Sequence, residues 1–251
     1  MSPYRFGFEP LFLVLAVAAA ALYWRAARRE PPSAWRIASF AAGLVLIAAS
    51  LNSPLENLAA HYLLLVHLLQ NALIADVAPL LVLLGLTPAM RDALNRHGAR
   101  HLQPRWILPV WLLAWYLTHL APFYNWALRT GWGLNLEHAI LVAAGLLFWW
   151  PIVTGRLTPA TGLAYLAVAF VGSAFLGLAY IFSSHPYYAY YEHAPRLWGL
   201  SATRDQSLGG ILMNAEQTLV FLLAIGYFVM RLLDEEHESG LNEADGSPAQ
   251  R

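Results

Sequence analysis

Long apolar runs recur along the chain and are separated by short polar segments. A helix needs roughly 20 apolar residues to cross a hydrocarbon core of about 30 Å. Seven segments meet this requirement: residues 8–24, 34–51, 58–86, 106 to about 123, 136–153, 162–182 and 208–233. The pattern therefore predicts an all-α membrane protein, a bundle of seven transmembrane helices. The third run is overlong and contains Pro79, which predicts a kink or a tilt.

The pattern also divides the chain into two parts. Residues 1–233 form the predicted transmembrane domain, and residues 234–251 form an acidic, polar tail. We expect this tail to be disordered and cytoplasmic. The first run resembles a signal peptide in its small residues, but most of its positive charges follow the apolar stretch instead of preceding it. We therefore expect an uncleaved span.

Arginine placement predicts the orientation of the bundle. With the N-terminus outside, the inner segments carry Arg25, Arg28, Arg29, Arg36, Arg91, Arg96, Arg100, Arg105, Arg156 and Arg231, whereas the outer segments carry Arg5, Arg129, Arg196 and Arg204. Positive residues concentrate on the cytoplasmic side of membrane proteins. The sequence thus predicts an outside N-terminus and an inside C-terminus.

The amino-acid composition is typical of a membrane protein and excludes several classes of protein and of metal site. Hydrophobic residues make up 59% of the 251 residues and charged residues only 12%, about half the share of a soluble domain. A soluble cytosolic enzyme, a disordered chain and a basic nucleic-acid binder are excluded, and a formal net charge of +0 gives no attraction to nucleic acid. Because cysteine is absent, disulfides and thiolate metal sites are excluded as well.

Ionisable residues inside predicted spans are costly and mark candidate functional sites. Four histidines, His61, His67, His119 and His138, lie at similar depth on the outer halves or ends of three predicted spans. A single buried histidine is more often a hydrogen-bond partner between helices. Four together make a metal site an equal alternative, with these residues as ligands.

Three further features have both a structural and a functional interpretation. Asp76 precedes Pro79. We expect its side chain to form a hydrogen bond with the backbone group that the proline leaves unpaired, and we favour this structural role over a role in proton transfer. Glu216 could pair with a His or Arg across the bundle or bind a cofactor. The aromatic run 186–191 predicts a membrane-interface belt in preference to a docking surface.

Ordered motifs across the later spans resemble a known family. The motifs are His67-Leu68-Leu69-Gln70 with Ala78-Pro79 and Gly85, then His119-Leu120-Ala121-Pro122-Phe123-Tyr124-Asn125-Trp126, then Glu137-His138 with Phe148-Trp149-Trp150-Pro151, and Gly199-Leu200-Ser201 before Asp205-Gln206 and Gly209-Gly210. Over roughly residues 50–230 this order is similar to the CtaG-type assembly proteins of caa-type cytochrome c oxidases.

The resemblance implies a function and a set of site residues. It implies a multi-pass protein of the bacterial plasma membrane that assists oxidase assembly without being an enzyme, has oxidase subunits and membrane lipids as partners, and handles copper. It adds Gln70, Glu137, Asp205 and Gln206 as candidate binding residues. This chain has Leu68 and Asn71 where the family pattern has Met and His, so a thioether and an imidazole suited to copper are missing.

Two other functions remain open at the level of sequence. One is a haem- or quinone-binding redox protein, which would use histidines from facing helices as axial ligands. The other is a small-ion transporter, which would use the polar residues as a pathway. Nucleotide-binding loops and the usual hydrolase motifs are absent from the sequence.

Overall fold

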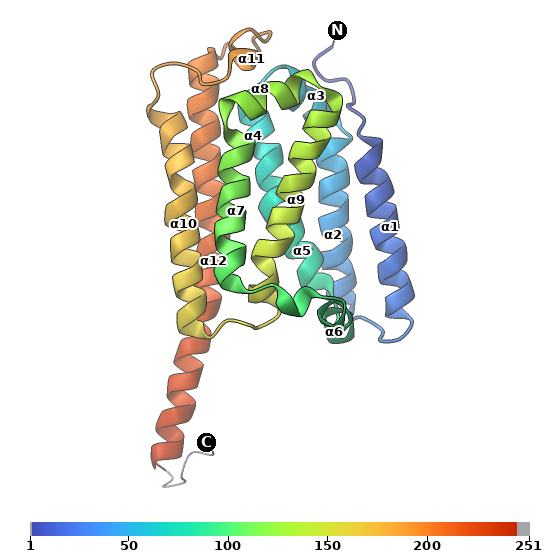
Figure 1. Ribbon diagram of the computed structural model, residues 1–251, viewed down its shortest axis with the longest axis vertical. Coiled ribbons are helices and arrows are strands. Elements are labelled where there is room, and N and C mark those ends of the chain that lie inside the picture. The colour runs from blue at the N-terminus through green and yellow to red at the C-terminus, as the bar shows by residue number, and fades with distance from the viewer. Residues whose placement is uncertain (1, 245–251) are drawn as a thin grey trace.

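The computed structural model describes residues 2–244, with side chains described as far as residue 239, and this part of the chain contains helices and no strands. Figure 1 shows the helices as an upright bundle with the N-terminus at one end and the C-terminus at the other. The elements are α1 (Pro10–Ala27), α2 (Ala34–Leu51), α3 (Pro54–His61), α4 (Leu64–Ala72), the π-helical η1 (Leu73–Val77), α5 (Ala78–Gly85), α6 (Pro88–Arg96), the 3₁₀ turn η2 (Ala99–His101), α7 (Pro104–His119), α8 (Ala121–Arg129), α9 (Gly131–Val153), α10 (Pro159–Phe182), α11 (Ala189–Glu192) and α12 (Ala202–Ala244).

The predicted all-α membrane bundle is confirmed. Six helical segments among the described residues are long and apolar enough to cross a membrane, and the bent pair of α7 and α8 makes a seventh if it counts as one span. The second predicted span matches α2 at both ends. The direction of the bundle across the membrane stays a prediction, although the two chain ends lie at opposite ends of it (Figure 1).

The third predicted span is divided into four elements. Leu63 has an extended backbone (φ −132°, ψ 122°), so α3 ends before it and α4 begins after it. His61 and His67 therefore sit on different helices, although the sequence placed them on one. Deeper in the span, Pro79 does distort the helix as predicted, and the distortion takes the form of the π-helical η1.

A glycine on α9 accommodates this distortion. Pro79 has no N–H for the Ala75 carbonyl and its ring crowds that oxygen, which pushes the chain out of regular α geometry. A Cβ built on Gly145 would lie 1.8 Å from the Ala75 oxygen, so only glycine permits this contact between η1 and α9. The contact fixes the height of the polar residues on both elements.

The fourth predicted span is bent. The axes of α7 and α8 meet at 63°, with the break at Leu120. Pro122 lies at the start of α8 and cannot donate to a preceding turn, so α7 ends at His119. The break places His119 at the end of the bundle that carries the N-terminus, together with α3, α8 and α11 (Figure 1). We call this end the N-terminal end.

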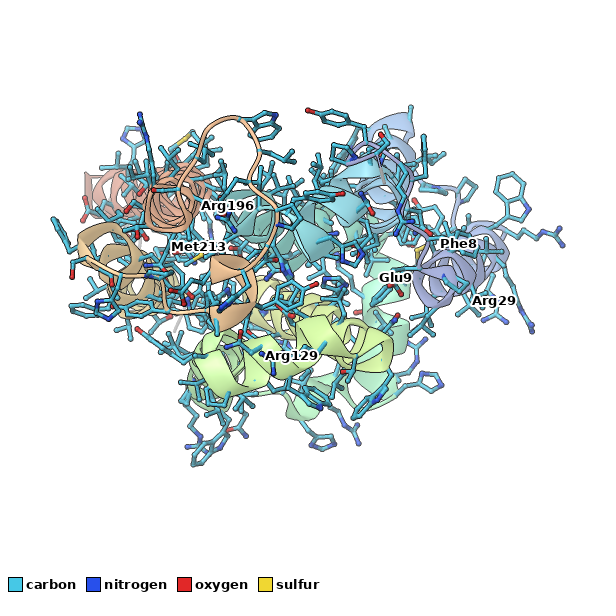
Figure 2. The ribbon with its side chains drawn as sticks, turned by 90° about the horizontal axis from the view of Figure 1, so that it is seen from above. Phe8, Glu9, Arg29, Arg129, Arg196 and Met213 are labelled. Atoms are coloured by element: carbon cyan, nitrogen blue, oxygen red, sulfur yellow. The ribbon has the colours of Figure 1, made fainter. Side chains whose placement is uncertain are left out.

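The first and the last helix both extend beyond the tightly packed part of the bundle, α1 at its side and α12 at its end (Figure 1). Only 6% of the α1 span is buried, and in the end-on view of Figure 2 this helix lies at one side of the bundle, near the labels of Phe8 and Arg29. At the other end of the chain, α12 continues through the first residues of the tail as far as Ala244, where disorder was expected. Arg231 pairs with Glu235 one turn on, at 3.5 Å, which favours continued helix. Residues 245–251 of the predicted tail lie outside the described residues.

Candidate functional site

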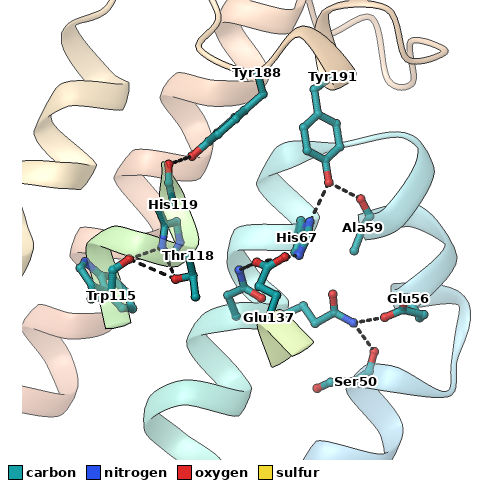
Figure 3. Close-up of polar contacts among 12 residues, drawn as sticks. Ser50, Glu56, Ala59, His67, Trp115, Thr118, His119, Glu137, Tyr188 and Tyr191 are labelled. Carbon is teal, nitrogen blue, oxygen red and sulfur yellow. Dashed lines mark hydrogen bonds and ion pairs between the residues drawn. The ribbon is translucent and has the colours of Figure 1, made fainter. Parts of the chain in front are cut away.

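A buried ion pair joins α4 to α9 near the N-terminal end. His67 Nε2 lies 3.5 Å from Glu137 Oε1, and both side chains are completely buried. Asn71, one turn after His67, donates from Nδ2 to the same carboxylate oxygen at 3.0 Å. The close-up in Figure 3 shows Glu137 pointing at His67. Two of the residues implied by the family resemblance thus meet directly.

Tyr191 determines which nitrogen of His67 carries a proton. The Tyr191 hydroxyl donates its single hydrogen to the carbonyl of Ala59. It can then only accept from His67 Nδ1, which lies 2.8 Å away. His67 Nδ1 is therefore protonated, and Nε2 faces Glu137 with no other protein partner.

Gln70 belongs to a second polar network, with Glu56 and the backbone of Ser50. Its Nε2 donates to the carbonyl of Ser50 at 2.8 Å and to the carboxylate of Glu56 on α3. Glu56 lies outside the candidate spans. Burial raises the pKa of Glu56 to about 7, although the Gln70 hydrogen bond acts in the opposite direction. Glu56 also lines a cleft of about 410 Å³ that opens at the N-terminal end, so the network reaches solvent there.

His119 occupies a separate position across an aromatic ring. Its Nδ1 donates to the Trp115 carbonyl at 2.7 Å, which leaves Nε2 buried and without a partner. The Tyr124 ring stands between the two histidines, with its centroid 4.9 Å from His67 and 5.8 Å from His119. Figure 3 shows His119 beside Trp115 and Thr118, apart from the His67–Glu137 pair.

His138 forms no hydrogen bonds through its imidazole ring. It is completely buried on α9, and neither of its ring nitrogens has a hydrogen-bond partner. Its ring centroid lies 5.9 Å from that of His67 and 6.0 Å from that of Phe12. The structure thus brings His67 and His138 together and places His119 beyond Tyr124.

His61 does not join these three histidines. Its side chain is exposed, and Nδ1 lies 3.4 Å from the Tyr190 hydroxyl in a cleft at the N-terminal end that Arg129 and His193 also line. Partial burial and the nearby Arg5 lower the pKa of His61. The four predicted metal ligands therefore do not form one cluster.

Asp205 and Gln206 have structural partners. The Asp205 carboxylate accepts the backbone N–H groups of Leu64 and Leu65, each at 2.9 Å, and so caps the first turn of α4. Gln206 binds the backbone of the loop before α11, accepting from Tyr187 N–H at 2.7 Å and donating to the His185 carbonyl at 3.3 Å. These contacts position the site and give no support to the predicted role in cofactor binding.

Asp76 and Glu216 lie deeper, and two structural expectations about them are wrong. Neither oxygen of Asp76 bonds the backbone that Pro79 frees, and neither oxygen of Glu216 bonds a His or an Arg. The elements that carry them, η1 and α12, are instead in contact with each other. They form a region separate from the histidines.

The sequence interpretation missed the tyrosines of the site. Tyr188 and Tyr191 were expected in an interface belt, yet they are 1% and 2% exposed and point inward. The Tyr188 hydroxyl donates to the His119 carbonyl at 2.7 Å, and Tyr191 contacts His67. Their three-residue spacing, which places both on one helical face, was the available signal. Glu56 was missed because it precedes the apolar run.

The arrangement of donors limits how a metal could bind. Among the residues that the structure describes, no three His, Asp or Glu side chains are placed to hold a metal ion together. Unpartnered ring nitrogens are nevertheless present on three spans, at His67, His119 and His138. This donor set fits a cargo ion held briefly by one or two imidazoles better than a permanent site with three or four ligands.

Comparison with known proteins identifies the family. No curated protein and no solved structure matches the chain significantly. The model of the cytochrome c oxidase caa3 assembly factor family (Caa3_CtaG) matches residues 17–235, which include every span from α2 to α10 and most of α1 and α12. The chain therefore belongs to the cytochrome c oxidase caa3 assembly factor family.

Proposed function

We propose that the protein is a non-catalytic assembly factor of a bacterial plasma membrane that handles copper as cargo for a cytochrome c oxidase. Membership of the family supports a role with oxidase components. The haem, quinone and transporter alternatives are not favoured by that membership. The finer proposal concerns which residues meet the copper and at which face of the membrane.

The observation that carries the copper proposal is the set of unpartnered imidazole nitrogens. Nε2 of His67, Nε2 of His119 and both ring nitrogens of His138 are buried without hydrogen-bond partners. Buried polar atoms in native proteins nearly always have a partner, so unpartnered ones need a ligand or another explanation. Imidazole is a good ligand for copper, and none of these nitrogens must first break a protein hydrogen bond.

The neighbours of His67 suit temporary binding. Tyr191 holds Nδ1 protonated and directs Nε2 toward Glu137 and the interior. An incoming cation bound at Nε2 would lie beside the Glu137 carboxylate, which would balance its charge. With Leu68 and Asn71 in place of Met and His, the site holds the ion with fewer ligands, which favours its release to a recipient subunit.

Arginine distribution supports delivery at the outer face. If the bundle lies with its N-terminus outside, the His67–Glu137 pair is near the periplasmic surface, where Glu56 lines a cleft that opens to solvent. Exposed apolar side chains on α1 and α10 are then available to membrane lipids. The copper-receiving subunit of the oxidase is the expected partner.

Complementation of a deletion strain tests the proposal. We expect His67→Ala and His138→Ala to lower oxidase activity in membranes, and added copper to restore part of it. His185→Ala is the matched control because His185 is exposed in the loop before α11. Immunoblots of membranes check that each variant accumulates. Full activity of both variants at low copper would contradict the role of these imidazoles.

A further inference from the structure

A second group of unpartnered polar side chains lies between η1 and α12, away from the histidines. Asp76 on η1 is completely buried, and neither carboxyl oxygen has a hydrogen-bond partner. Glu216 on α12 is partly exposed along its stem, yet both of its oxygens are buried and unpartnered. Gln217 is 1% exposed, and both atoms of its amide lack a partner.

The two carboxyls lie at the same depth in the bundle. Asp205 caps α4 through Leu64 and Leu65, so the two helices are level at this point, and both run away from the N-terminal end (Figure 1). Asp76 follows Leu64 by twelve residues and Glu216 follows Asp205 by eleven. At about 1.5 Å per residue, both lie roughly 17 Å below the cap, near the middle of a membrane. Contacts between η1 and α12 and the electrostatic interaction of the carboxyls agree with this placement.

Gln217 lies on the buried face of α12. Met213 and Phe221 lie one turn before and one turn after it, on the same face of α12. Met213 packs in one buried cluster with Ala75, the neighbour of Asp76. Phe221 contacts the Trp149 ring edge-on, at 6.0 Å between centroids, and the Trp149 N–H lies near Asp76 but outside hydrogen-bonding geometry. Gln217 is thus placed between the elements that carry Asp76 and Trp149.

Within the described part of the chain, this group forms no ion pair with a basic side chain. The ion pairs recorded among the described residues join His67 to Glu137 and Arg231 to Glu235, and neither involves Asp76 or Glu216. A charged carboxylate at mid-membrane is costly and is found paired or at functional sites. Two of them side by side, with an unpartnered amide, make a set of oxygen atoms without a positive charge.

We propose that Asp76, Glu216 and the Gln217 amide oxygen form a binding site for one small hard cation at the centre of the membrane. Carboxylate and amide oxygens are the ligands that hard cations such as Na⁺ and Mg²⁺ prefer, and they suit cuprous copper poorly. The bound ion links η1 to α12 and so holds the distorted third span against the last one. The site uses none of the residues proposed for copper.

Thermal unfolding of the purified full-length protein in detergent tests the site. Midpoints are measured in choline chloride and after replacement by NaCl or by MgCl₂ at equal ionic strength. We expect at least one of the two metal ions to raise the wild-type midpoint in a saturable way. Asp76→Asn and Glu216→Gln should fold and lose this rise. Glu235→Gln is the matched control, an exposed carboxylate further along α12, and should keep it.

The alternative occupant of the same oxygens is a proton. Infrared spectra distinguish it, because protonated carboxyls give bands that vanish in Asp76→Asn and Glu216→Gln. If such bands persist in NaCl and in MgCl₂ while neither ion changes the wild-type midpoint, protons alone occupy the pair and the proposal is overturned. Equal ion responses in wild type and both variants would overturn it too. Neither result bears on the copper proposal, which the histidine variants test separately.

Discussion

Polar side chains are buried both at the N-terminal end and at mid-membrane, but the cost of burial is compensated differently in the two regions. His67, Glu137, Asn71 and Tyr191 contact one another, so the cost of burying them is offset within the protein. Asp76 and Glu216 have no such partners. Removing one residue of the first group should therefore destabilise the protein, because its partners lose a contact. Replacing a carboxyl of the second group by an uncharged amide should be tolerated when no ligand is bound.

Gly145 is where the two groups are linked, and its substitution should have the largest effect. A Cβ in Gly145→Ala would press on the Ala75 oxygen, so η1 and α9 must separate, which disturbs Asp76 and Glu137 together. We expect loss of the folded protein from membranes, or destabilisation of more than about 3 kcal/mol. Gly226→Ala is the control, because its Cβ would meet open space, and it should be neutral or slightly stabilising. Wild-type accumulation and stability of Gly145→Ala would show that this contact is not required.

Glu137→Ala and Asp76→Asn test the comparison itself. Glu137→Ala leaves the Asn71 Nδ2 donor buried without its acceptor, removes the ion pair with His67, and should cost about 3–5 kcal/mol. Asp76→Asn removes a charge that has no partner, so in buffer without Na⁺ or Mg²⁺ it should change the free energy of unfolding by less than about 1 kcal/mol. Denaturation in mixed detergent micelles measures both. The reverse order of effects would refute the distinction between the two groups.

Glu56 predicts how stability depends on pH at the N-terminal end. Burial raises its pKa to about 7 in the folded protein, so the folded state binds more protons than the unfolded state between about pH 4.5 and pH 7. The free energy of unfolding should therefore fall as the pH rises through this window, by up to about 3 kcal/mol, and level off above it. Glu56→Gln keeps the size of the side chain and should reduce the slope. Identical pH profiles of the unfolding midpoint in the two proteins would exclude this titration.

Loss of the Asp205 cap should have a smaller effect than loss of Glu137 or than the full titration of Glu56. Asp205→Ala removes the acceptor of the Leu64 and Leu65 N–H groups and should cost about 1–2 kcal/mol, as for other helix caps. Asp92→Ala, at an exposed position on α6, serves as control and should be neutral. Hydrogen exchange at the first turn of α4 localises the change. No increase in exchange there would mean that the cap is replaceable.

Much of the fold could be predicted because apolar run length alone defines a span. Residues 34–51 match α2 at both ends, and Pro79 marked the distorted region correctly. The extended backbone at Leu63 and the bend at Leu120 could not be read in the same way, since both lie inside apolar sequence. The start of α4 depends on a distant contact, the Asp205 cap, and Pro122 marks the bend only once α7 and α8 are seen to meet there.

The site could be predicted by residue type and only partly by geometry. The high cost of ionisable groups in a membrane correctly selected His67, Glu137 and His138 as buried residues. Helical periodicity could not reveal that Gln70 contacts Glu56 while Asn71 contacts Glu137, because their partners lie on other helices. The spacing of Tyr188 and Tyr191 indicated a shared face, but the contacts of Tyr191 with Ala59 and His67 depend on distant segments and could not be predicted.

Copper binding by the purified protein tests the central claim most directly. Cuprous copper is titrated in competition with a chromophoric chelator, with wild type, His67→Gln, His138→Phe and the exposed control His185→Ala side by side. The account predicts uptake by wild type and His185→Ala, and loss of uptake in His67→Gln and His138→Phe at unchanged folding. Equal uptake by all four proteins would contradict it.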